Sequence, residues 1–174
     1  MDVMNALLER RSCKGYKPDP VPEEILEGIL AAGMYAPSGM GKQSPIFLCV
    51  TNKEMRDRLS KLNAAIIGTT SDPFYGAPAV IVVLIPADAR TGIYDGSLAL
   101  GNMMLAAWEK GIGSCWIHRA KESFETEEGK AILKELGIEG DYVGVGNCIL
   151  GYRDETVPYR DRLPRKENYV YYAK

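Results

Sequence analysis

One run of apolar residues limits how this chain can fold. The seven residues from Ala79 to Ile85 read Ala-Val-Ile-Val-Val-Leu-Ile, with no polar side chain among them. The run is rich in β-branched residues and far shorter than the roughly 20 residues that cross a bilayer, so it predicts a β-strand. Because a strand that is apolar at every position has both faces covered, the chain is expected to fold around a buried central strand.

Hydrophobic periodicity predicts further elements on either side of that strand. Short apolar runs predict strands, and spacings of three and four residues predict helices. The expected strands cover residues 46–51, 113–117 and 143–150, and the expected helices cover 2–10, 22–33, 52–62, 94–110 and 123–136. Asp2 and Asn52 are suited to cap two of these helices. The order of elements favours an α/β or α+β architecture with one mixed sheet.

Length and charge narrow the classes of partner. A chain of 174 residues fits one domain over residues 1–174. Lys and Arg number 21 against 23 Asp and Glu, so the basic excess typical of nucleic-acid binders is missing and no nucleic-acid partner is expected. The N-terminus shows no basic leader before an apolar stretch, which favours a cytoplasmic protein with no membrane partner. The four cysteines are widely spaced and are expected to be reduced thiols rather than metal ligands.

Two segments carry more apolar surface than a small chain can bury alone. The helix expected over 94–110 is apolar almost all round, and the chain ends in Tyr169-Val170-Tyr171-Tyr172. A helix of that kind belongs in a core or an interface. The pattern therefore predicts a homodimer.

A cation cluster stands where the first helix is expected to end. Arg10-Arg11-Ser12-Cys13-Lys14 brings three cations and a hydroxyl within five residues, which suits an anion with several oxygens. The same cations could instead complement the helix dipole. Spacing alone leaves the two interpretations even.

Other motifs for phosphate binding or hydrolysis fail on inspection. Gly41-Lys42 has Ala36 where a P-loop needs its first glycine, and Gly144-Val145-Gly146 has Ile149 where a dinucleotide fingerprint needs its third. His118 is the only histidine, and no Gly-x-Ser-x-Gly elbow accompanies it. Such sparse acid–base machinery suggests that a cofactor performs the chemistry.

Five blocks in order carry a family resemblance. They are Arg10-Arg11-Ser12-x-Lys14-x-Tyr16, the loop from Ala36 to Gln43, the segment from Phe74 to Ile81, Gly111-Ile112-Gly113-Ser114-Cys115-Trp116-Ile117, and Arg165-Lys166. With these blocks the chain resembles the nitroreductase-like FMN-dependent flavoproteins along nearly its whole length. The resemblance implies an α+β fold of the nitroreductase type, with a central mixed sheet flanked by helices, and an intertwined homodimer with FMN at the subunit interface.

The resemblance also implies which residues hold the cofactor. Arg10, Arg11, Ser12, Lys14 and Arg165 are expected near the FMN phosphate. Pro37, Ser38, Gly39, Gly41 and Gln43 are expected to reach the flavin of the other subunit. Cys115, Trp116, Ile117 and His118 are expected along one side of the isoalloxazine ring. No metal ligand and no catalytic side chain is expected.

The implied activity is a two-step hydride relay. NADH or NADPH would reduce FMN, and a small electron-poor acceptor such as a nitroaromatic or a quinone would then take the hydride. Two alternatives stay open. One is a flavin-binding protein for storage, delivery or redox sensing with little turnover, and the other is a specialised reduction such as dehalogenation.

Overall fold

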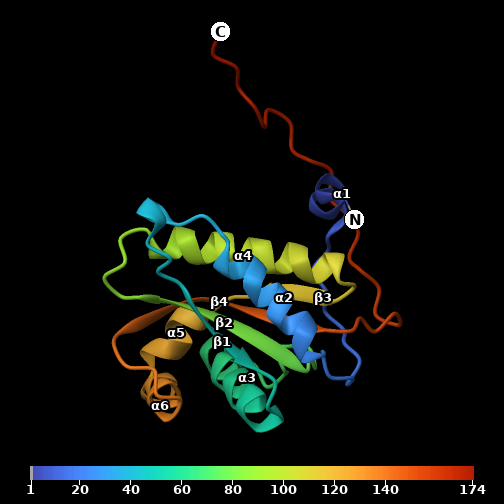
Figure 1. The fold of residues 1–174 in the computed structure, drawn as a ribbon. Coiled ribbons are helices and arrows are strands. Elements are labelled where there is room, and N and C mark those ends of the chain that lie inside the picture. Colours follow the sequence, from blue (N-terminus) through green and yellow to red (C-terminus); the bar gives the residue numbers. More distant parts are fainter. Residues whose placement is uncertain (1) are drawn as a thin grey trace.

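The computed structural model describes residues 2–174 and places the apolar run at the centre of a four-stranded sheet (Figure 1). The run forms β2 (Ala79–Pro86), and none of its residues from 79 to 85 is more than 3% exposed, which confirms the expected burial. The sheet has the order β1-β2-β4-β3. The other strands are β1 (Ile46–Val50), β3 (Gly113–Ile117) and β4 (Tyr142–Gly151).

Each neighbouring pair of these strands is antiparallel. Among residues 2–174 a parallel pairing occurs only as an isolated bridge between Ser12 and Ser114. The expected α+β fold is confirmed, and its sheet is mixed only through that bridge. The strands β2 and β3 run in the same direction, because α4 (Gly92–Glu109) leads the chain back between them, and β4 lies antiparallel between the two.

Helices cover both faces of the sheet (Figure 1). The helices α2 (Glu23–Met34) and α4 lie on one face, and α3 (Lys53–Ile67), α5 (Ala120–Glu125) and α6 (Glu127–Glu135) lie on the other. Side chains of β2 alternate between the two layers, as the pleat of a strand requires. Ile81 and Val83 pack with α2 and α4, whereas Val80 and Val82 pack with α3, α5 and α6.

Two predicted helix caps are confirmed. The Asp2 carboxylate precedes α1 (Val3–Glu9) and accepts a hydrogen bond from the backbone nitrogen of Met4 at 3.4 Å. The Asn52 side chain precedes α3 and accepts one from the backbone nitrogen of Met55 at 2.9 Å. A short side-chain acceptor at these positions satisfies a backbone N–H that the helix itself leaves free.

The single helix expected over 123–136 is wrong, because the chain breaks there into α5 and α6. Thr126 adopts an extended conformation between them and its Oγ1 accepts a hydrogen bond from the backbone nitrogen of Gly129 at 3.0 Å. The two helices meet so closely that a Cβ on Gly129 would lie 2.1 Å from the Ser123 carbonyl oxygen. The pattern of polar residues predicted that α5 and α6 are helical, but it did not predict the break at Thr126 between them.

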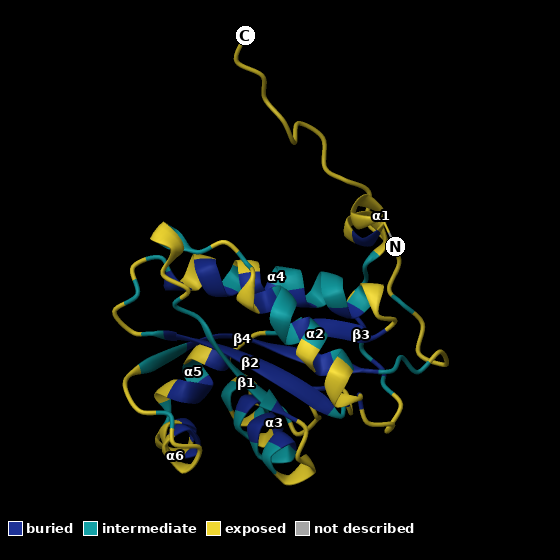
Figure 2. Ribbon diagram, in the orientation of Figure 1, coloured by how far each residue is buried: buried dark blue, intermediate teal, exposed yellow. Residues whose placement is uncertain are grey.

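Both ends of the chain are largely exposed (Figure 2) and carry large apolar side chains. On α1 they are Val3, Met4, Leu7 and Leu8, and in the extended tail they include Leu163, Tyr169, Val170, Tyr171 and Tyr172. The tail projects away from the body of the molecule (Figure 1). None of the helices described in residues 2–174 has the length and apolar character needed to cross a membrane.

Candidate functional site

The cation cluster forms an extra edge beside β3. Helix α1 ends at Glu9, and the backbone of Arg10 then turns to an extended conformation. Ser12 then pairs with Ser114 of β3 in the parallel bridge, and the Cys13 nitrogen donates to the Ser114 carbonyl oxygen at 2.9 Å. Backbone pairing therefore fixes Ser12 and Cys13, at the centre of the cation cluster, against β3.

These side chains line a cavity of about 650 Å³. Its walls comprise Arg10, Arg11, Ser12, Cys13, Lys14, Cys115, Trp116, Arg153, Val157, Pro158, Tyr159 and Arg160. The structure thus brings six of the predicted site residues together and adds two arginines that the sequence did not single out. The walls hold five cations and no carboxylate, so the cavity suits an anionic ligand.

Arg10 provides the sharpest sign of such a ligand. Its NH1 nitrogen is buried and has no hydrogen-bond partner among residues 2–174. Nor does an ion pair join Arg10 to any carboxylate of that part of the chain. Burying a charged donor without a partner is strongly unfavourable. The Arg10 NH1 nitrogen therefore indicates a ligand with an anionic oxygen.

A segment near the C-terminus closes the cavity. Residues 153–160 run beside the stretch that follows the cation cluster, and the Asp154 nitrogen donates to the Gly15 carbonyl oxygen at 3.0 Å. The approach is so close that a Cβ on Gly15 would lie 2.5 Å from Cγ2 of Val157. Farther along, an Arg11 guanidinium nitrogen donates to the Arg160 carbonyl oxygen. These contacts fix one wall of the cavity.

Two buried asparagines hold the end of β3. The Asn147 side chain donates to the Ile117 carbonyl oxygen at 3.3 Å, and the Asn63 side chain donates to the His118 carbonyl oxygen at 2.8 Å. Arg119 then turns the chain with a φ of 74°. Ile117 and His118 are thereby held rigidly, although neither lines the cation cavity.

The thiol of Cys115 is not activated. Burial raises its pKa, and the hydrogen bond with Ser12 and the charges of Lys14 and Arg10 offset only part of that effect. A thiol with a raised pKa is a poor nucleophile. The described residues also hold no group of three or more His, Cys, Asp or Glu side chains arranged for a metal ion. The side chains present can bind and orient an anion but offer no nucleophile with its base.

The loop with the predicted residues Pro37, Ser38, Gly39, Gly41 and Gln43 lies elsewhere in the single chain. It borders a separate cavity of about 360 Å³ beside α2, β1 and α4. Met40 and Gln43 have φ values of 54° and 50°, which non-glycine residues rarely adopt. Backbone strain of that kind persists only where surrounding contacts enforce it.

Asp95 of α4 enforces this loop conformation. Its Oδ1 accepts from the Gly39 nitrogen at 2.9 Å, and its Oδ2 accepts from the hydroxyls of Thr91 at 2.9 Å and Ser44 at 3.1 Å. Burial raises the pKa of Asp95, but these hydrogen bonds lower it by more. The pKa of Asp95 therefore lies below its ordinary value. The only sign of this role in the sequence is that Asp95 is a lone carboxylate near the start of an apolar helix.

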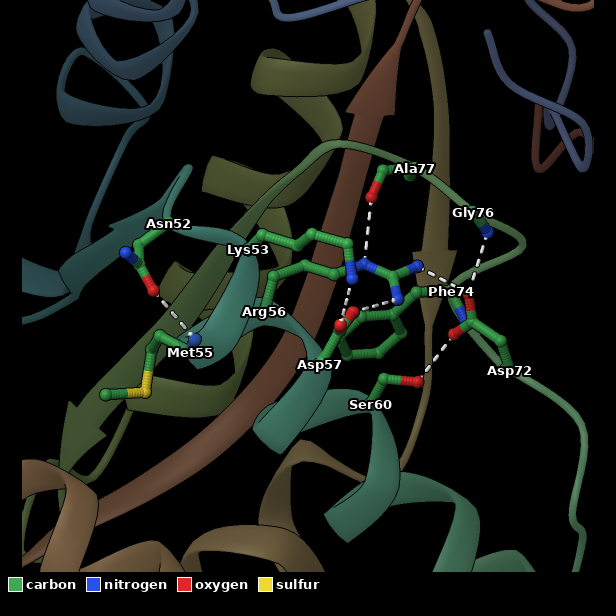
Figure 3. Close-up of polar contacts among 10 residues, drawn as sticks. All are labelled: Asn52, Lys53, Met55, Arg56, Asp57, Ser60, Asp72, Phe74, Gly76 and Ala77. Carbon is green, nitrogen blue, oxygen red and sulfur yellow. Dashed lines mark hydrogen bonds and ion pairs between the residues drawn. The ribbon is translucent and has the colours of Figure 1, made fainter. Parts of the chain in front are cut away.

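A second anchored turn stands beside Lys14. Arg56 of α3 is 8% exposed and donates to Asp57, to Asp72 and to the Ala77 carbonyl oxygen (Figure 3). Because Arg56 binds both Asp72 and Ala77, it fixes the two ends of the turn over residues 72–77.

The turn presents an aromatic ring to the cation cluster. Asp72 accepts from the backbone nitrogens of Phe74 and Gly76 at 2.9 and 2.8 Å, which stabilises Tyr75 at a φ of 53° between them (Figure 3). The Lys14 Nζ lies 5.4 Å from the centre of the Tyr75 ring, within the range of a cation–π interaction.

Arg165, predicted beside the cluster, lies in the exposed tail. Its NH2 nitrogen donates to the Leu163 carbonyl oxygen at 3.1 Å, and it is not part of the cavity wall. Arg153 and Arg160 occupy that wall instead. Sequence reasoning missed both because they lie in a polar stretch where charge usually indicates solvent exposure.

Sequence comparison places the chain among known proteins. A model described as the "Nitroreductase family" matches residues 7–70 and 66–152. A protein of Archaeoglobus fulgidus named "Putative NADH dehydrogenase/NAD(P)H nitroreductase" is 33% identical over 95% of this chain and 98% of its own. A protein of the same name from Methanothermobacter thermautotrophicus is 30% identical over 67% of this chain, and the match spans only 60% of that relative.

Solved structures agree with this placement. A nitroreductase with bound FMN from Bacteroides fragilis superposes with a TM-score of 0.88 at 28% identity and covers all of both chains. Another FMN-bound nitroreductase, from Desulfitobacterium hafniense, gives 0.85 at 26% identity over 99% of this chain and all of the other.

Proposed function

The chain belongs to the nitroreductase family, and on that premise we propose that it is an FMN-dependent oxidoreductase whose residues 10–14 bind the flavin phosphate. The observation that carries the proposal is the buried, unpartnered NH1 of Arg10 in a cavity walled by cations. A phosphate offers several oxygens to such a cluster, with Arg as a fork and Lys as a point charge. FMN in the two similar structures supports the choice of ligand.

The chain's own groups have defined roles in this proposal. The cations and hydroxyl of residues 10–14 hold the phosphate, and the backbone of 115–118, whose last two residues are fixed by Asn63 and Asn147, faces the ring. When bound, FMN would accept a hydride from NADH or NADPH and pass it to a small electron-poor acceptor such as a nitroaromatic or quinone. The protein contributes orientation and exclusion of water, and no side chain acts as a nucleophile.

We also propose that residues 1–174 form one FMN-binding domain that assembles as a homodimer. Both layers of the core share β2, which favours a single domain. The exposed apolar residues of α1 and of the tail offer surface to a second copy. The loop over 37–43 does not line the cation cavity of its own chain. In the proposed dimer it would instead contact the flavin of the other subunit.

The absorption spectrum of the purified protein tests the cofactor directly. A flavin band, present on purification or after addition of FMN, is expected. Arg10→Ala should weaken FMN binding by about 1.5–3 kcal/mol, the range for a charged hydrogen bond. A colourless protein that stays colourless with FMN, or an unchanged affinity in the variant, contradicts the phosphate site.

Turnover is a separate question with its own measurement. Anaerobic addition of NADH or NADPH should bleach the flavin band, and steady oxidation of the nicotinamide with menadione should follow. Flavin binding without nicotinamide oxidation would instead support a storage, delivery or sensing role.

A further inference from the structure

Arg153 stands just after β4 and is paired through its backbone with the stretch that follows the cation cluster. It forms an isolated antiparallel bridge with Tyr16, four residues beyond Ser12. The neighbouring Lys17 nitrogen donates to the Tyr152 carbonyl oxygen at 2.9 Å. Arg153 is therefore attached to the same backbone frame as the predicted phosphate ligands.

The guanidinium of Arg153 is only partly satisfied. Its NH2 nitrogen donates to the Val157 carbonyl oxygen at 3.2 Å. Its Nε is buried and has no hydrogen-bond partner within residues 2–174, the same condition as NH1 of Arg10, which lines the same cavity. Two buried guanidinium nitrogens without acceptors, on residues that line one cavity, are explained together by a single multivalent oxyanion.

An aromatic ring holds this guanidinium in place. The Arg153 Cζ lies 4.2 Å from the centre of the Tyr159 ring, and the Arg11 Cζ lies 5.5 Å from the same centre. Stacking on an aromatic face fixes the plane of a guanidinium without occupying its in-plane donors. The contact with Tyr159 therefore leaves the N–H of the Arg153 Nε without an acceptor among residues 2–174.

We propose that Arg153 is a further ligand of the flavin phosphate and takes the position that the sequence pattern gave to Arg165. The inference rests on the proposed FMN function. It adds a binding residue from the 153–160 segment, so the phosphate would join α1, β3 and the C-terminal part of the chain. The partner is a phosphate monoester, because the cavity offers several separated donors to one compact anion.

Binding of two flavins to variant apoproteins tests the proposal. Arg153→Gln should weaken FMN binding about 10-fold to 100-fold, as expected for a lost charged hydrogen bond. The same change should alter riboflavin binding less than about twofold, because riboflavin lacks the phosphate. Arg165→Gln is the matched control and should leave both affinities unchanged, since Arg165 lies in the exposed tail.

The thermal stability of the apoprotein separates ligand binding from a structural role. Because the Arg153 side chain is half-buried and its one hydrogen bond is exposed, Arg153→Gln should leave the unfolding temperature of the apoprotein nearly unchanged. Equal losses of FMN and riboflavin affinity, or a lowered unfolding temperature, would overturn the proposal. So would a large effect of Arg165→Gln with none of Arg153→Gln. If the wild type binds neither flavin, the proposed function itself fails instead.

Discussion

Asp95 is a buried carboxylate that forms no ion pair within residues 2–174. Three hydrogen bonds stabilise its charge, and all three donors belong to the loop over 37–44 or to the turn that opens α4. A carboxylate can accept from all of these donors at once, and Gly39 is required because a Cβ there would lie 2.3 Å from Thr91 Oγ1. The Asp95 side chain therefore fixes the conformation of the strained loop over 37–44.

Asp95→Asn should destabilise the protein by about 1.5–3 kcal/mol near neutral pH, because charged hydrogen bonds become neutral ones. The folded-state pKa of Asp95 is lowered, so its contribution is complete above its unfolded pKa of about 3.9 and is lost as the pH falls through the folded value. The difference between the unfolding temperatures of the two proteins should be full at about pH 7 and should shrink as the pH falls below the ordinary carboxyl pKa. A constant difference would assign the stabilisation to packing.

The sequence indicated some site residues and not others for a physical reason. Arg10, Ser12 and Lys14 are adjacent in the chain, so their pattern was visible without the fold. Asp95 and Arg153 gain their importance from burial and from partners far away in sequence. No local pattern carries that information.

At the scale of elements, the turn over 72–77 depends on an ion pair that is only partly exposed. Arg56→Met should remove the donors to Asp72 and to the Ala77 carbonyl oxygen and lower the free energy of unfolding by about 1.5–3 kcal/mol. Lys53→Met is the matched control, because that side chain is 87% exposed and its ion pair with Asp57 should contribute less than about 1 kcal/mol. Urea denaturation measures both, and similar losses would contradict the role of Arg56.

Hydrophobic periodicity predicted where the helices and strands lie in the chain, but not which strands pair with one another. The apolar run of β2 and the caps at Asp2 and Asn52 are local features, and the structure has them where they were expected. The order β1-β2-β4-β3 arises from which edges meet, and the break at Thr126 arises from the contact between Gly129 and Ser123. Both depend on tertiary packing.

At the scale of the whole molecule, the proposed dimer should depend on the tail. Deleting residues 163–174 removes five large exposed apolar side chains and leaves the cation cavity complete. The deletion should shift the protein from dimer toward monomer in sedimentation experiments, because buried apolar area drives association. Substituting Lys166 and Glu167 with alanine is the control, and an unchanged dimer after the deletion would locate the interface elsewhere.

In the proposed dimer, the exposed tail and α1 would also affect how the protein responds to dilution. If these surfaces are covered only by a second copy, part of the folding free energy comes from association and varies with the logarithm of the protein concentration. Cofactor retention would vary in the same way, because each flavin would be held by groups of both subunits. Abundance would then decide what fraction of the chains carries flavin, even with no change in any residue that touches it.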